Sequence, residues 1–253
     1  MVLSLELAGV GIGVTILLAA GAVVAGSLTR PAGALAAVFG SVIVVLAGFP
    51  YLALLALFVL ASSLATRYRF EEKRRRQVQE GRFGERGVSN VLAHILIPTA
   101  LVLAASADPG GFPSGLLPLA YTGAIAFGSA DTFASEFGVL AGSARSLLTG
   151  KPVPPGTNGG ISARGELFAL LGGGLTGVVG ATLLYVGGAG AADLLLVAGG
   201  AALAGFLGCQ VDSLLGELGE NRGYLGKGGV NFLGMLSSVG IAVVLYAGAG
   251  GRL

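Results

Sequence analysis

Long apolar stretches recur along almost the whole chain, and they constrain its fold more than any other feature. A transmembrane helix needs about 20 largely apolar residues. Stretches near that length occur at residues 3–25, 33–47, 51–66, 88–105, 116–137, 165–186, 191–215 and 230–247. The sequence therefore predicts an all-α, polytopic transmembrane helical bundle with about eight spans, forming a single integral membrane domain over residues 1–253. The second and third stretches are short, which leaves open whether both cross fully.

The composition agrees with a chain that lies in lipid. Charged residues make up 11% of the 253 residues and hydrophobic residues 54%, with a mean hydropathy of +0.85. A soluble domain carries about 25% charged residues. The chain has 46 glycines, many of them spread along the apolar runs, and small residues of this kind let transmembrane helices pack closely. No pattern in the sequence suggests binding of nucleic acid, and the oligomeric state is left open.

Lysine and arginine are distributed unequally between the two sets of loops that eight spans create. Of the 15 basic residues, 14 fall in the odd-numbered loops, and Arg252 alone falls on the other side. Cytoplasmic loops of membrane proteins carry the excess of positive charge. We therefore expect a basic cytoplasmic loop at residues 67–87 and a cytoplasmic Pro/Gly-rich loop at residues 139–164, in a membrane that we expect to be a prokaryotic cell membrane.

Acidic side chains near the ends of two spans form the main candidate site. Asp131 is followed by Thr132 and, five positions after the aspartate, by Glu136; Asp212 is followed in the same way by Ser213 and Glu217. This repeat suggests a pseudo-symmetric pair of helices. An ionisable group in a membrane segment is costly and indicates a functional site by default. The alternative is a set of polar contacts that hold helices together.

The two aspartates are the simplest metal ligands in this pattern. On a regular helix Asp131 and Glu136 point about 140° apart, so one ion does not easily bind both. An ion between Asp131 and Asp212 bridges two helices instead. One or two carboxylates plus substrate phosphates are the usual ligands of Mg²⁺. We predict Mg²⁺ at Asp131 and Asp212, with Glu136 and Glu217 as further ligands or orienting groups.

A loop between the two acidic stretches contains Gly156, Thr157, Asn158, Gly159 and Gly160. Successive glycines let backbone N–H groups turn towards an anion, and a helix beginning near Ser162 adds its dipole. An ordinary Pro/Gly turn is the alternative. No Walker A sequence occurs in the chain, so a phosphate site here is of another kind. Lys151 is expected to supply a charge to a phosphate.

Further polar residues surround these stretches. A basic segment contains the run Lys73-Arg74-Arg75-Arg76. One explanation is membrane topology and attraction to anionic lipid. The alternative is that Lys73, Arg82 or Arg86 reaches over the site towards nucleotide phosphates. Asn90 begins the fourth span and is expected to face the same cavity. Asn231 begins the last span, as an N-cap or as a phosphate contact. A packing role is the preferred interpretation for His94.

Several segments together resemble an integral-membrane family catalogued as of unknown function, number ninety-two, which includes the plant phytyl phosphate kinase and prokaryotic relatives. The segments are Leu28-Thr29-Arg30, Gly87-Val88-Ser89-Asn90, residues 129–136, residues 154–160, Gly208 with Asp212-Ser213, and Val230-Asn231-Phe232. The resemblance implies a lipid-phosphate kinase that uses CTP or another nucleoside triphosphate with Mg²⁺. Its substrate would be a phytyl, geranylgeranyl or other polyprenyl monophosphate, converted to the diphosphate at the cytoplasmic face.

The roles expected for individual residues follow from this reading. Asp131, Glu136, Asp212 and Lys151 are the expected catalytic residues; substrate contacts are expected from Arg86, Asn90, Thr132, Ser135, residues 156–160, Ser213 and Asn231. The lipid tail is expected to enter between glycine-rich helices. Two alternatives stay open: CTP-dependent cytidylyl transfer to a lipid phosphate, and a secondary transporter with a carboxylate ion site.

Overall fold

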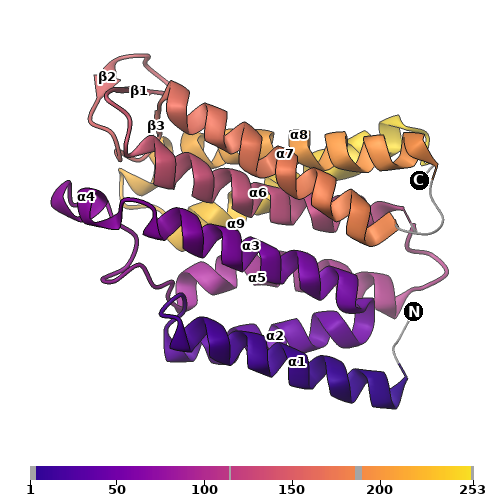
Figure 1. Ribbon diagram of the computed structural model, residues 1–253. Helices are drawn as coiled ribbons and strands as arrows, with labels where there is room; N and C mark the ends of the chain where they lie inside the picture. Colours follow the sequence, from indigo (N-terminus) through magenta and orange to yellow (C-terminus); the bar gives the residue numbers. More distant parts are fainter. Residues whose placement is uncertain (1–3, 114, 186–189, 252–253) are drawn as a thin grey trace.

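The protein is a bundle of long helices that lie side by side, as a computed structural model of residues 4–113, 115–185 and 190–251 shows (Figure 1). Within those ranges the long helices are α1 (Leu5–Val24), α2 (Arg30–Ala47), α3 (Phe49–Arg67), α5 (Val88–Ala107), α6 (Leu116–Gly138), α7 (Ala163–Tyr185), α8 (Ala191–Leu215) and α9 (Lys227–Gly248). They correspond one to one to the eight expected spans, and the all-α bundle is confirmed. The expected limits Leu3 and Val186 lie outside the described residues.

The two ends of the bundle differ in character. Helix α1 begins and α9 ends at one end, which indicates an even number of crossings (Figure 1). The opposite end carries the short helix α4 (Phe70–Arg75) and the strands β1 (Ala144–Ser146), β2 (Pro152–Val153) and β3 (Gly160–Ile161). The loops rich in lysine and arginine open at this second end. Arg252, the one basic residue expected on the other side, lies outside the described residues.

Helix α6 lies at the centre of the bundle. Of its 23 residues, 15 are buried, more than among the described residues of any other helix. Seven described helices are long and apolar enough to cross a membrane by composition, and α6 is not among them. Because neighbouring helices surround α6 in place of lipid, this helix accommodates polar residues that a lipid-facing helix excludes.

Glycines bring α6, α7 and α8 into close contact. A Cβ atom on Gly172 of α7 would lie 2.7 Å from the carbonyl oxygen of Ser129 in α6, and one on Gly205 of α8 would lie 2.6 Å from the carbonyl carbon of Ala126. A Cβ on Gly177 would clash with the carbonyl oxygen of Ala198 in α8. This packing confirms the interpretation of the glycines. At these contacts the backbones of α6, α7 and α8 meet directly.

The segment between α6 and α7 contains a small antiparallel sheet that was not expected from the sequence. Its strand order is β2-β1-β3, with Arg145 opposite Pro152 on one side and Ile161 on the other. The strands are only two or three residues long, which is too short for a periodic pattern to be recognised. The sheet holds residues 156–160 against the end of the bundle.

The close packing of α7 on α8 predicts a large difference between two neighbouring glycines. The substitution Gly177→Ala should lower the free energy of unfolding by about 1–3 kcal/mol, because its methyl group meets backbone in a packed interface. The matched substitution Gly174→Ala on the same helix meets nothing within 4 Å and should leave stability unchanged or slightly higher. Unfolding by denaturing detergent, followed by circular dichroism, measures both; equal losses would contradict the packing argument.

Candidate functional site

A polar cavity of about 300 Å³ lies at the end of the bundle that carries α4 and the strands. Its walls come from α6, α8, α9, the segment between α4 and α5, and the loop between β2 and β3. Most of the residues expected to form the site line this one cavity: Arg86, Asn90, Asp131, Thr132, Ser135, Glu136, residues 156–160, Asp212, Ser213 and Asn231. Residues that are up to about 145 positions apart in the sequence are thus brought together by the fold.

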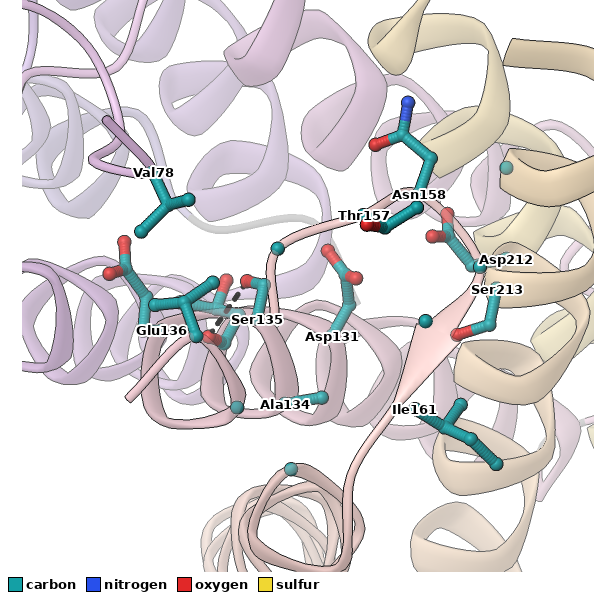
Figure 2. A pocket seen from close by; sticks show the side chains of 18 of the residues that line it. Val78, Asp131, Ala134, Ser135, Glu136, Thr157, Asn158, Ile161, Asp212 and Ser213 are labelled. Carbon is teal, nitrogen blue, oxygen red and sulfur yellow. Dashed lines mark hydrogen bonds between the residues drawn. The ribbon is translucent and has the colours of Figure 1, made fainter. Parts of the chain in front are cut away.

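Asp131 and Asp212 face the same space from two different helices. Figure 2 shows both carboxylates on the side of the loop that carries Thr157 and Asn158. Asp131 belongs to α6 and Asp212 to α8, and both residues line the polar cavity. The Oδ1 atom of Asp212 is buried and has no hydrogen-bond partner among the described residues. Two adjacent carboxylates with an unsatisfied oxygen form an arrangement that a cation stabilises.

The cavity carries an excess of acidic groups. Among the described residues, six carboxylates and two basic side chains line it. The carboxylates are those of Glu80, Asp131, Glu136, Glu166, Asp212 and Glu220, and the basic residues are Arg86 and Lys227. Two of the carboxylates are neutralised by lysines, as described below. The remaining four exceed the one unpaired basic group, so a polyphosphate would be repelled unless a metal cation accompanied it.

Glu136 was expected to be a metal ligand or an orienting group. Both oxygens of its carboxylate instead bind other protein side chains. Its Oε2 pairs with Lys73 Nζ at 2.6 Å, and its Oε1 accepts a hydrogen bond from Thr66 Oγ1 at 2.6 Å. Lys73 also donates to the carbonyl oxygens of Ala65 and Thr66, and its side chain is fully buried. Lys73 therefore does not reach over the site, and Glu136 fixes the end of α3 and the start of α4 against α6.

Glu217 and Lys151 lie away from the cavity, which corrects their expected roles. The chain forms a π-helical turn at Gly216–Glu220 directly after α8, and Glu217 accepts hydrogen bonds from Ser146 Oγ at 2.5 Å and Leu148 N at 3.2 Å. Glu217 thus anchors the strand segment. Lys151 is exposed beside β2, and neither residue is among those that line the cavity.

The loop at residues 156–160 has both a structural and a binding character. Gly159 has φ +76°, and a Cβ there would clash with Glu217, so a glycine is required for the loop to approach η1 (Gly216–Glu220). The N–H of Gly160 donates to the carbonyl of Thr157 at 2.8 Å and is not free for an anion. The side chains of Thr157 and Asn158 line the cavity above the two aspartates (Figure 2).

Sequence reasoning missed an ion pair on the opposite wall. Lys227 at the start of α9 lies 2.5 Å from Glu80 in the segment between α4 and α5. Burial raises the pKa of Glu80, but the Lys227 ammonium outweighs burial and holds this pKa below its ordinary value. The sequence analysis used Lys227 only as a basic residue of a cytoplasmic loop. Lys227 precedes Asn231 by about one helical turn, and this spacing could have placed it at the same cavity as Asn231. Gln77, Gln79, Glu166 and Glu220 were also not anticipated.

The buried pair of Lys73 and Glu136 generates a stability prediction. Lys73→Met should lower the free energy of unfolding by about 3–5 kcal/mol, because it leaves the Glu136 charge buried without its partner. The double variant Lys73→Met/Glu136→Gln should recover much of this loss, since no charge stays buried. Thermal unfolding of the purified variants in detergent measures both effects.

An exposed residue of the same helix supplies the control for that prediction. Arg74 is 56% exposed in an ion pair of the surface kind, and Arg74→Met should cost less than about 1 kcal/mol. Equal losses for Lys73→Met and Arg74→Met, or no recovery in the double variant, would contradict the role assigned to the buried pair.

Comparison with known proteins identifies the family of this chain. A family model described as integral membrane protein DUF92 matches residues 13–236. An uncharacterized membrane protein of Methanocaldococcus jannaschii is 33% identical over 210 residues, which cover 83% of this chain and 82% of the relative. Protein PGR of Arabidopsis thaliana is 37% identical over 196 residues, covering 70% and 67%.

A third relative, an uncharacterized membrane protein of Synechocystis, is 32% identical over 200 residues, covering 76% of this chain and 73% of the relative. No solved structure matches the chain. The family match spans the whole cavity described above, from the segment before Arg86 to Asn231. The chain therefore belongs to the DUF92 family of integral membrane proteins.

Proposed function

We propose that the protein transfers the terminal phosphoryl group of a nucleoside triphosphate, with CTP as the first candidate, to an isoprenoid monophosphate. One observation carries the proposal: Asp131 and Asp212, from separate helices, line one polar cavity with the Thr157–Asn158 loop and two basic residues. Phosphoryl transfer asks a protein mainly for positioning and charge stabilisation. The open side of the cavity lies where the basic loops gather, which is the side expected to face the cytoplasm.

The donor atoms in the cavity fit Mg²⁺. Oxygen atoms of Asp131 and Asp212, including the unsatisfied Oδ1 of Asp212, would hold it. Among residues 4–113, 115–185 and 190–251, no three acidic, histidine or cysteine side chains gather into a complete metal site. Mg²⁺ typically takes one or two carboxylates and completes its shell with water and substrate phosphates. When bound, it would neutralise charge on the phosphate oxygens.

The other residues of the cavity position the two phosphates. Arg86 is buried at 8% exposure and lines the cavity together with Asn90. Its guanidinium can bind the lipid phosphate, because arginine and phosphate form two parallel hydrogen bonds. Lys227 and the side-chain amide of Asn158 offer donors to the nucleotide phosphates from the other walls, whereas the hydroxyl of Thr157 donates to the carbonyl oxygen of Pro154. An oxygen of the lipid monophosphate attacks the γ-phosphorus, and the bond from that phosphorus to the β,γ-bridging oxygen breaks. The electron pair leaves with the nucleoside diphosphate.

No general base is assigned, because an ionised phosphate oxygen is already a nucleophile. The attack therefore needs alignment of the two phosphates more than removal of a proton. This explains why a cavity without a free histidine is sufficient for the proposed reaction: His94 is buried and is not among the residues that line it.

Product analysis tests the proposal directly. Purified protein is incubated with Mg²⁺, a panel of isoprenyl monophosphates, and either CTP or ATP labelled at the γ-phosphate. The expected result is a labelled isoprenyl diphosphate together with unlabelled CDP or ADP. Release of pyrophosphate with a CMP-linked lipid would identify cytidylyl transfer instead. Absence of both products with every lipid would overturn the enzyme proposal.

Substitution of the two aspartates tests whether the proposed activity depends on the cavity. Asp131→Asn and Asp212→Asn should each lower kcat by at least about 10²-fold, a loss of the size seen when a group that stabilises charge in the transition state is removed. Both should also lose the thermal stabilisation that Mg²⁺ with nucleotide gives the wild type. Lys151→Ala, outside the cavity, is the control and should keep wild-type activity. A fully active aspartate variant would remove the metal assignment.

A further inference from the structure

A second, smaller cavity of about 60 Å³ adjoins the polar one. It is lined by side chains of α2, α3 and α5 and by two neighbouring residues: Leu28, Ala36, Leu55, Phe58, Val59, Ser62, Ser63, Arg86, Asn90, Val91, His94 and Ile95. Arg86 and Asn90 line both cavities. The two spaces therefore meet at these side chains, which are the ones placed beside the lipid phosphate.

The lining of this second cavity changes from polar to apolar with depth. Helix α3 ends and α5 begins at the end of the bundle that carries the polar cavity. Ser62, Arg86 and Asn90 lie near that end, and deeper positions on the same helices carry Leu55, Phe58 and Ile95. A cavity that is polar at the phosphate end and apolar below it matches an amphiphile with its charged head towards the loops.

Two unsatisfied polar atoms lie near the polar end. Ser62 Oγ is buried without a hydrogen-bond partner in the part of the chain that the structure describes, and the same holds for His94 Nε2. His94 Nδ1 lies 2.8 Å from the carbonyl oxygen of Asn90, so Nδ1 carries the hydrogen and Nε2 is a free acceptor. Buried polar groups are normally hydrogen-bonded. The hydroxyl of Ser62 can donate to a phosphate oxygen at this end of the cavity, whereas Nε2 of His94 can only accept a hydrogen bond, as from water.

Two residues that line this cavity, one on α2 and one on α3, are partly exposed at the surface of the bundle. Ala36 of α2 and Val59 of α3 are half-buried, whereas Leu55 and Phe58 are buried. The alternative route through α6, α7 and α8 is closed by backbone contacts at Gly172, Gly177 and Gly205.

We propose that the cavity between α2, α3 and α5 binds the apolar tail of the lipid monophosphate, next to its phosphate at Arg86 and Asn90. This inference rests on the proposed function for the identity of the head group and names the path of the substrate tail. The first isoprene unit lies against Leu55, Phe58 and Ile95. The rest of the tail leaves the protein between Ala36 and Val59 and lies in the bilayer.

Side chains that fill the cavity test this path. Ala36→Phe and Val59→Phe place a ring in the tail position, and Ala34→Phe puts the same ring on an exposed part of α2 as the matched control. Equilibrium binding of tritiated geranylgeranyl monophosphate to each purified variant is measured without nucleotide. Both filling variants should bind at least about 10-fold more weakly than the wild type, and the control should bind as the wild type does.

The two filling variants lie on different helices, so misfolding of one leaves the other as a test. Size-exclusion elution and melting temperature show whether each variant is folded. A geranylgeranyl monophosphate analogue with a diazirine on its first isoprene unit supplies an independent readout on the wild type. Crosslinks to peptides of α2, α3 or α5 support the path. Crosslinks confined to α7 and α8, unchanged affinity in both folded filling variants, or no binding by the wild type would overturn it.

The outcomes also separate this inference from the kinase proposal. If the filling variants weaken binding but no nucleotide yields a diphosphate with the wild type, the tail site stands and the proposed activity falls. If the wild type and both filling variants form diphosphate with the same KM for the lipid, the activity stands and the tail site falls.

Discussion

The close packing of α6, α7 and α8 is the constraint on which the candidate site depends. Glycines at the contacts let backbone meet backbone, and this surrounds α6 with protein on almost every side. A helix shielded in this way can carry Asp131 without exposing it to lipid. The same packing brings α8 alongside, so that Asp212 faces the space that Asp131 faces. Without this contact the two carboxylates would have no common cavity.

The repeated Asp and Glu residues divide two tasks between them. In each repeat the aspartate faces the cavity, and the glutamate five positions later holds a neighbouring segment: Glu136 binds Lys73, and Glu217 binds Ser146. The spacing turns the two side chains to different sides of the helix. Each helix end therefore supplies one group for binding and one for fixing the loops that close the cavity. The buried position of Lys73 shows that a basic run can serve packing as well as topology.

The two cavities together fit the amphiphilic substrate proposed above. The polar cavity has a surplus of acidic side chains, and a mostly apolar cavity adjoins it at Arg86 and Asn90. Lys227 and Glu80 close the opposite wall by joining the start of α9 to the segment after α4. In these proposals head group, cation and tail have separate places in one bundle, and Arg86 and Asn90 lie where the two cavities meet.

The sequence by itself determined the number and order of the spans, because lipid selects apolar runs of a fixed length. It also singled out the two aspartates, since polar groups in apolar runs are costly, and the Thr157–Asn158 loop, because of its successive glycines. The tertiary structure alone decided which polar groups are free: Glu136 and Glu217 look equivalent to the aspartates in sequence, but partners 63 to 71 positions away engage them. Lys227, Glu80 and the cavity at His94 depend likewise on contacts between distant segments, which no local pattern records.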